Sequence, residues 1–98
     1  MFSNKVCIVT GAGKGIGLSI VKSFLKNNNI IFACTKNDTS HLENLKESNK
    51  ANLENLHILK FDLNDNNSCK ENLKLIWKQY SRIDILVNCA AIPHGGLF

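Results

Sequence analysis

The sequence predicts an α/β protein in which helices cover both faces of an open, parallel β-sheet. Short apolar runs alternate with segments whose apolar residues recur at helical spacing, and this alternation predicts four strands and three helices. The connections are short, and a glycine-rich segment follows the first apolar run directly. Because parallel strands joined by helices need right-handed crossovers, the predicted sheet is doubly wound.

The first strand is predicted at residues 5–10, where KVCIVT is apolar, rich in β-branched residues and followed by glycine. From Ile16 to Leu25 the apolar residues fall at helical spacing, and the asparagines at 27–29 end this first helix. Residues 30–34 form the second predicted strand. Strands this apolar are typical of sheets that are buried on both sides.

The second helix is expected to begin at a capping box, in which Ser40 and Glu43 would bond the free N–H groups of the helix start. We expect this helix to end between Asn49 and Asn55. The apolar run at residues 56–61 then predicts the third strand.

A second capping box, Ser68 with Glu71, is expected to start the third helix. The apolar residues that follow share one helical face: Leu73, Ile76, Trp77 and Tyr80. We expect this face to pack against the sheet. Residues 83–87 (IDILV) predict the fourth strand.

The composition is that of a globular protein, with 98 residues that are 44% hydrophobic and 20% charged. No apolar run is long enough to span a bilayer, and the first residues lack the separate charged and apolar regions of a secretory signal. We therefore expect a cytoplasmic protein with no membrane partner. The net charge of +4 comes from lysines spread through the predicted helices, so no nucleic-acid partner is expected.

Four cysteines occur at positions 7, 34, 69 and 89, with no C-x-x-C spacing. Such scattered thiols argue against a zinc centre or a redox pair, and no metal site is predicted. Three of them fall in apolar strand patterns, where a free thiol behaves as a small hydrophobe. We expect all four to be reduced core residues.

The most informative segment is T-G-A-G-K-G-I-G at residues 10–17, between the first strand and the first helix. A glycine-rich turn here lets the backbone approach a ligand, and the helix start directs N–H groups at an anion such as a pyrophosphate. Ligands of open α/β sheets lie beyond the carboxyl ends of the strands, where this loop falls. Its residues are the first predicted cofactor contacts: Thr10, Gly11, Gly13, Lys14, Gly15, Ile16 and Gly17.

The glycine spacing differs from the common dinucleotide fingerprint. G-x-G-x-x-G starting at Gly11 would need glycine where Ile16 stands, whereas T-G-x-x-x-G-x-G fits the segment. The alternative is a tight strand-to-helix turn that binds nothing. Binding is favoured because further motifs follow at suitable distances.

Together with two later segments, this loop resembles the short-chain dehydrogenase/reductase family over essentially the whole chain. Phe61-Asp62-Leu63 resembles the family's Asp-Leu after the third strand, and Asn88-Cys89-Ala90-Ala91 resembles its Asn-Asn-Ala-Gly motif. In the latter, Cys89 and Ala91 replace Asn and Gly. The resemblance implies the first four strands and three helices of a Rossmann-type sheet, with residues 1–98 as the N-terminal dinucleotide-binding part of a single domain.

The resemblance also implies roles for these later residues. The Asp62 carboxylate, with Leu63 beside it, would meet the adenine amino group. Asn88 and Ala90 would lie at the cofactor's ribose region. The alternatives are that Asp62 only caps the turn after its strand and that Asn88 is only a turn residue.

The end of the second strand favours NADP over NAD. An acid for the ribose 2′-hydroxyl of NAD would be expected at Thr35, and Lys36 follows where NADP-dependent relatives often carry Arg. Lys14 is a second cation for the dianionic 2′-phosphate. The competing acid, Asp38, is expected to belong to the turn before the next helix. The alternative is that both lysines are merely solvated.

The resemblance implies a homo-oligomeric NAD(P)(H)-dependent carbonyl reductase, acting on 3-oxoacyl thioesters or on sugars and dicarbonyl compounds. The family's catalytic Tyr-x-x-x-Lys is not found in these 98 residues, because Tyr80 is the one tyrosine and position 84 holds Asp84. No catalytic residue is therefore named, and His94 is interpreted as a surface histidine. The alternatives are a non-catalytic nucleotide-binding module or degenerate paralogue, and a phosphate receiver, which would need acids where Thr10 and Gly11 stand.

Overall fold

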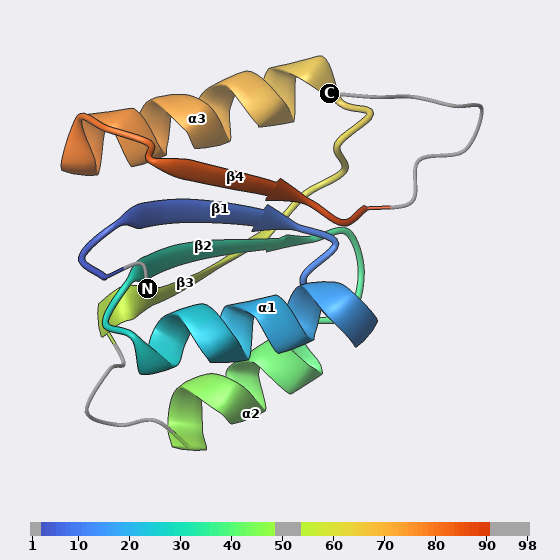
Figure 1. The fold of residues 1–98 in the computed structure, drawn as a ribbon. Coiled ribbons are helices and arrows are strands. Elements are labelled where there is room, and N and C mark those ends of the chain that lie inside the picture. Colours follow the sequence, from blue (N-terminus) through green and yellow to red (C-terminus); the bar gives the residue numbers. More distant parts are fainter. Residues whose placement is uncertain (1–2, 49–53, 91–98) are drawn as a thin grey trace.

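The computed structural model describes residues 3–48 and 54–90, which form one four-stranded sheet with three helices (Figure 1). The elements follow in the order β1 (Val6–Thr10), α1 (Gly15–Lys26), β2 (Ile30–Thr35), α2 (Ser40–Ser48), β3 (Leu56–Lys60), α3 (Asn66–Tyr80) and β4 (Ile85–Asn88). The predicted α/β class and the alternation of elements are confirmed. The expected end of the second helix falls largely on residues 49–53, outside the described part.

All neighbouring strands pair in parallel, in the order β3-β2-β1-β4. Val6 of β1 lies opposite Ile30 of β2, and Cys7 lies opposite Ile85 of β4. The chain thus adds β2 and β3 on one side of β1 and then returns to the other side with β4. Such a reversal opens a crevice at the carboxyl ends of β1 and β4, where ligands of these folds bind.

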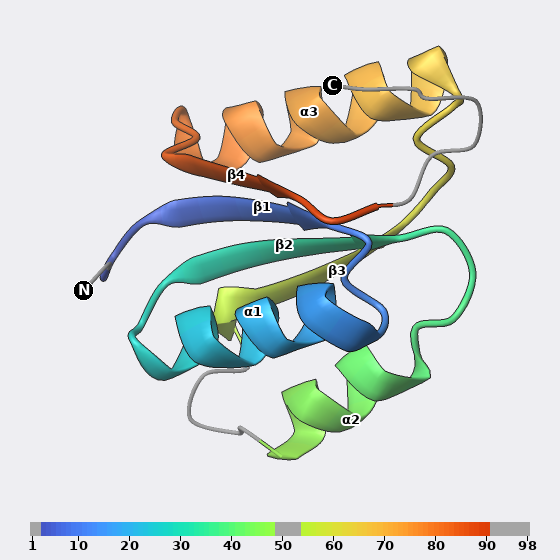
Figure 2. The same cartoon turned by 45° about the vertical axis from the view of Figure 1, so that its right-hand side comes forward.

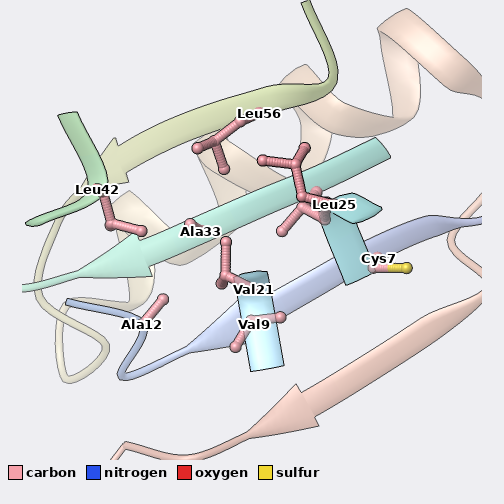
Figure 3. Close-up of a cluster of buried hydrophobic side chains, with 9 residues drawn as sticks. Cys7, Val9, Ala12, Val21, Leu25, Ala33, Leu42 and Leu56 are labelled. Atoms are coloured by element: carbon pink, nitrogen blue, oxygen red, sulfur yellow. The ribbon is translucent and has the colours of Figure 1, made fainter. Parts of the chain in front are cut away.

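The two faces of the sheet are covered unequally, with α1 and α2 on one face and α3 alone on the other (Figures 1 and 2). Figure 3 shows the core beneath α1 and α2, where Val9, Ala33 and Leu56 from three strands meet Val21 and Leu25 of α1. Among the helices of the described chain, none has the length and apolar character needed to cross a membrane.

The core beneath α3 contains a polar contact. Ile8 and Phe32 point to this face, because side chains alternate along a strand, and they pack with Ile76 of α3. His57 of β3 stacks on Phe32 with ring centroids 4.5 Å apart, and its Nε2 lies 3.2 Å from the Tyr80 hydroxyl. Tyr80 thus packs against the sheet, as the helical spacing predicts.

The rest of the predicted apolar face of α3 packs less well than expected. Trp77 is 56% exposed and Leu73 is 47% exposed, although Ile76 between them is buried. Leu86 of β4 is 57% exposed as well. In the described part of the chain β4 is the outermost strand, so no further strand or helix lies against this flank of the sheet.

Both predicted capping boxes are wrong, because an aspartate ahead of each serine caps the helix. Ser40 is the first residue of α2, and its N–H donates to Asp38 Oδ1 at 2.9 Å. In α3, Asp65 accepts from the N–H groups of Asn67 and Ser68. The N–H and then the hydroxyl of Ser68 lower the pKa of Asp65. A charged carboxylate is the stronger acceptor, so it takes the cap.

The strands β1 and β4 are also joined at their amino ends. Asp84 Oδ2 accepts the N–H of Val6 and the Nε–H of Arg82, each at 2.8 Å, and the N–H of Asp84 donates to the Val6 carbonyl. The bonds from Val6 and then Arg82 lower the pKa of Asp84. The strand itself begins at Ile85 rather than at the predicted Ile83, and its register with β1 starts where Ile85 lies opposite Cys7.

All four cysteines are free thiols, but only two of them are fully buried. Cys7 and Cys34 lie in the core, whereas Cys69 and Cys89 are partly exposed, so the expectation of four core residues is half wrong. Burial, with a smaller effect of Asp84, raises the pKa of Cys7 to about 11. Burial, with a smaller effect of Cys69, raises the pKa of Cys34 to about 12. Both thiols are therefore protonated at neutral pH.

Candidate functional site

A cleft of about 700 Å³ lies at the carboxyl edge of the sheet, between the glycine-rich loop and the loops that follow β2 and β3. Nine of the predicted site residues line it: Gly11, Gly13, Lys14, Gly15, Ile16, Lys36, Asp62, Leu63 and Ala90. The three others, Thr10, Gly17 and Asn88, are not among the lining residues. One cleft thus brings together residues that are distant in sequence.

The glycine-rich loop holds two residues in the left-handed region, Gly11 with φ +62° and Gly15 with φ +59°. A Cβ on Gly11 would lie 2.7 Å from the backbone nitrogen of Ala90, so glycine is required there by both conformation and space. A Cβ on Gly15 would meet nothing within 4 Å. Gly15 is therefore explained by its backbone conformation alone, and it leaves that part of the loop open to the cleft.

The start of α1 packs against this loop through Gly17. A Cβ on Gly17 would overlap the carbonyl oxygen of Gly11, so a side chain there would push the helix away. Lys14, at the helix start, has an extended backbone and makes no side-chain cap. The N–H groups of the first helical turn thus face the cleft side without a capping side chain, which is a favourable arrangement for an anion.

A second contact fixes the loop against the end of β2. The Ala12 N–H donates to the Cys34 carbonyl at 3.0 Å. A Cβ on Gly13 would lie 2.7 Å from Thr35 Oγ1 and 2.8 Å from the Asp38 carbonyl oxygen. The absence of a side chain at Gly13 therefore lets the two loops meet and form one wall of the cleft.

Thr10 and Asn88 join the two central strands behind that wall. The Thr10 hydroxyl donates to Asn88 Oδ1 at 2.7 Å, and the Cys89 N–H donates to the Thr10 carbonyl at 3.3 Å. These bonds hold Ala90 against Gly11 at the edge of the cleft. The direct contact of Thr10, Gly17 and Asn88 with a cofactor stays a prediction; in the structure they position the residues that line the cleft.

Lys36 and Asp62 face each other across the cleft's outer edge. Lys36 Nζ lies 3.6 Å from Asp62 Oδ2, and the two side chains are 62% and 41% exposed. The ladder between β2 and β3 continues one step beyond the strands, since the Phe61 N–H donates to the Thr35 carbonyl at 3.1 Å. This continuation brings the next residues of the two strands together, which sequence spacing alone does not reveal.

Asp62 also has the turn-capping role that was its alternative interpretation. Its Oδ1 accepts the N–H of Asn64 at 2.9 Å, while Oδ2 faces Lys36. The competing acid Asp38 belongs to the turn before α2, as expected. The hydroxyl and then the N–H of Ser40 lower the pKa of Asp38, so its carboxylate is engaged in capping that helix.

Six further residues line the cleft that were not among the predicted cofactor contacts: Cys34, Asn37, His41, Phe61, Asn64 and Cys89. All of them belong to, or directly follow, the carboxyl ends of strands or the first turn of α2. The one signal that could have found them is that position itself, because loops at this edge converge on one crevice. The predicted surface histidine, His94, and Ala91 lie outside the described residues.

A family model for short chain dehydrogenases matches residues 5–98. A 3-oxoacyl-[acyl-carrier-protein] reductase of Buchnera aphidicola is 29% identical over 90 residues, which are 92% of this chain and 36% of that protein.

Two solved structures share the fold. The L-sorbose reductase of Gluconobacter frateurii, complexed with NADPH and L-sorbose, superimposes with a TM-score of 0.78 at 24% identity over 93% of this chain and 35% of that one. A metagenomic short-chain oxidoreductase in complex with NADP superimposes with a TM-score of 0.80 at 23% identity. The match covers 93% of this chain and 41% of that one. The chain therefore spans little more than a third of the length of these proteins. Given the glycine-rich loop, the strand order and a family model that covers nearly every residue, the chain belongs to the short-chain dehydrogenase family.

Proposed function

We propose that the chain forms the cofactor-binding part of an NADP(H)-dependent carbonyl reductase. The observation that carries this proposal is the cradle formed by the glycine-rich loop and the start of α1. Gly11 and Gly17 let Ala90 and the helix pack closely against the loop, while a Cβ on Gly15 would meet no protein atom within 4 Å, so this part of the loop is open to the cleft. The cradle opens onto a cleft of about 700 Å³, which suits the adenosine and pyrophosphate parts of a dinucleotide. The bound nicotinamide would supply hydride transfer; the chain's own residues bind and orient the cofactor.

The preference for a 2′-phosphate rests on charge. Lys14 and Lys36 both line the cleft, while Thr35 stands where an acid would accept from the ribose 2′-hydroxyl of NAD. Asp38, the acid nearest in sequence, caps α2. The two structural relatives described above are complexed with NADPH and with NADP, which supports the same choice.

The substrate class is proposed from the relatives. The Buchnera protein is a 3-oxoacyl thioester reductase, and the Gluconobacter enzyme is complexed with a sugar. We therefore propose a carbonyl compound of one of these two kinds, reduced by catalytic residues outside the 98 in this chain. By the same resemblance we propose a cytoplasmic homo-oligomer, and the free thiols fit a reducing compartment.

The test is to measure the dissociation constants of NADPH and NADH for the complete protein at one salt concentration. NADPH should bind about 10- to 100-fold more tightly, since each charged hydrogen bond to a phosphate contributes about 1.5–3 kcal/mol. Lys36→Met should remove much of this preference. Lys70→Met, on the exposed surface of α3, is the matched control and should not change it. Equal affinities, or tighter NADH, would contradict the assignment.

A non-catalytic nucleotide-binding module is the second candidate, because a cleft of this kind can bind a nucleotide without any catalytic residue. It predicts NADPH binding without turnover. Oxidation of NADPH that depends on a 3-oxoacyl thioester or a diketone would exclude it.

A further inference from the structure

The ion pair between Lys36 and Asp62 joins two groups that the proposed function assigns to different parts of the cofactor. Lys36 is the proposed partner of the 2′-phosphate and Asp62 that of the adenine amino group, yet in the structure they bind each other at 3.6 Å. Both also line the cleft. A nucleotide that enters the cleft therefore meets a cation and an anion that are already paired.

The geometry restricts what a phosphate can do there. A phosphate oxygen bonded to an ammonium lies about 2.8 Å from its nitrogen. If Lys36 kept its place, the phosphate would come within about 6 Å of the Asp62 carboxylate, a like charge. If Lys36 moved toward the phosphate, its contact with Asp62 would be lost. In both cases the Asp62 carboxylate weakens the binding of the 2′-phosphate. A nucleotide that has no 2′-phosphate does not experience this effect.

We propose that Asp62 is a specificity-determining residue, which competes with the ligand's 2′-phosphate for Lys36 and so limits the preference for NADP(H) over NAD(H). This inference rests on the proposed function, because it needs a nucleotide in the cleft. Binding of a 2′-phosphorylated nucleotide exchanges the partner of Lys36 from carboxylate to phosphate. The exchange frees Asp62 Oδ2 as an acceptor, while Oδ1 keeps its bond to the Asn64 N–H.

The magnitude is modest because the pair is partly exposed. Both side chains are in contact with solvent, which screens their attraction. Neutralising the carboxylate should therefore strengthen the binding of a 2′-phosphorylated nucleotide by about three- to tenfold. Asp62→Asn suits this purpose, because it removes the charge while its amide oxygen can still accept from the Asn64 N–H.

The experiment compares adenosine 2′,5′-bisphosphate with 5′-AMP, two ligands that differ only in the 2′-phosphate, by titration of the complete protein. Asp62→Asn should raise the affinity for the bisphosphate relative to that for AMP by about three- to tenfold, because a changed contact with adenine affects both ligands equally. In the Lys36→Met background the same substitution should give little or no gain for the bisphosphate. Glu71→Gln, an equal loss of charge on the exposed surface of α3, is the control and should change neither ligand.

A carbodiimide cross-link tests the pair without any ligand. Lys36 and Asp62 should form an amide in the free protein, adenosine 2′,5′-bisphosphate should protect against it, and AMP should protect much less. A failure to cross-link, an equal effect of Asp62→Asn on both ligands, or a gain that persists in Lys36→Met would overturn the exchange even if NADPH binds well. A protein that cross-links but binds neither nucleotide would instead overturn the proposed function.

Discussion

At the scale of the residue, the hydrogen atom that serves as the side chain of Gly17 sets how closely α1 approaches the glycine-rich loop. A Cβ at this position would overlap the Gly11 carbonyl, which belongs to the loop that faces the cleft. The same loop contains Gly15, whose Cβ would meet no atom. Two glycines in one motif thus have different physical causes, namely space at Gly17 and backbone conformation at Gly15.

Gly17→Val should abolish NADPH binding with little loss of helical content. The branched side chain would move α1 away from the loop and disturb the N–H groups at its start. Ser19→Val is the matched control, because it adds the same side chain at an exposed position of α1. Fluorescence titration of NADPH, with circular dichroism of both variants, checks the expectation; unchanged affinity in a folded Gly17→Val protein would show that the loop is only a turn.

His57 should make the protein less stable in mild acid. Burial, followed by the nearby charge of Lys46, lowers the pKa of His57 from 6.5, although a backbone hydrogen bond with Glu54 acts in the opposite direction. The unfolded chain therefore takes up a proton before the folded one does, and the free energy of unfolding falls as the pH drops below about 6.5.

Urea unfolding at pH 7.5 and 5.5 measures this effect. The decrease in stability should be smaller in His57→Gln, which cannot be protonated in this range, and should persist in His41→Gln, where an exposed histidine is lost. An equal decrease in stability in the wild type, His57→Gln and His41→Gln would show that a group other than these histidines causes it.

At the scale of the element, the order of strands and helices is the part of the structure that the amino-acid pattern predicts best. Runs such as residues 5–10 carry their own signal, because burial on both faces demands continuous apolar character. Which residue caps a helix depends on which acceptor atom lies nearest to the free N–H groups. Ser40 and Ser68 both fit the capping-box pattern, but a nearby aspartate accepts these N–H groups instead. Sequence spacing does not show which of two neighbouring acceptors lies closer to the free N–H groups.

Asp65→Ala should lower the melting temperature by a few degrees, because it leaves the N–H groups of Asn67 and Ser68 without their acceptor. Glu71→Ala removes the residue that the capping-box pattern singles out, and it should have a much smaller effect. Differential scanning calorimetry of the two variants decides between the caps. A larger loss in Glu71→Ala would contradict the assignment of Asp65.

In the candidate site, too, the spacing of residues in the sequence predicts some features and not others. The glycine-rich loop is visible in the sequence because its spacing is regular, and the cleft contains five of its residues. The Lys36–Asp62 pair is not visible, because it depends on the β2–β3 register that places Thr35 opposite Lys60. Long-range register is a property of the folded sheet, and no local motif encodes it.

At the scale of the whole molecule, one side of the sheet is covered less completely than the other. Leu86 of β4 and Trp77 of α3 are both more than half exposed, and β4 is one of the two edge strands of the described residues. The 3-oxoacyl-[acyl-carrier-protein] reductase that the chain matches is nearly three times as long as this chain. An apolar edge of this kind is a template for pairing with another chain.

The 98-residue chain expressed alone should therefore be catalytically inert, and it should aggregate and unfold less cooperatively than the complete protein. Leu86→Lys should delay the aggregation of the short chain, since a charge on an exposed edge opposes strand pairing. Leu75→Lys, at a leucine that is 51% exposed on α3, is the matched control and should not delay it. Static light scattering follows the effect. If the wild-type 98-residue chain is soluble and folds cooperatively, the expected instability is wrong. If it oxidises NADPH in a carbonyl-dependent reaction, the expected lack of catalysis is wrong.

The bond between Thr10 and Asn88 has a consequence for the order of events during synthesis. These residues lie 78 positions apart, and their bond holds Ala90 against Gly11 at the rim of the cleft. A ribosome releases the glycine-rich loop early, but Asn88 and Ala90, which support the loop, emerge only after a further 78 residues. In a nascent chain the glycine-rich loop therefore gains its support from Asn88 and Ala90 only when β4 docks beside β1, which makes the assembly of this rim a late event in synthesis.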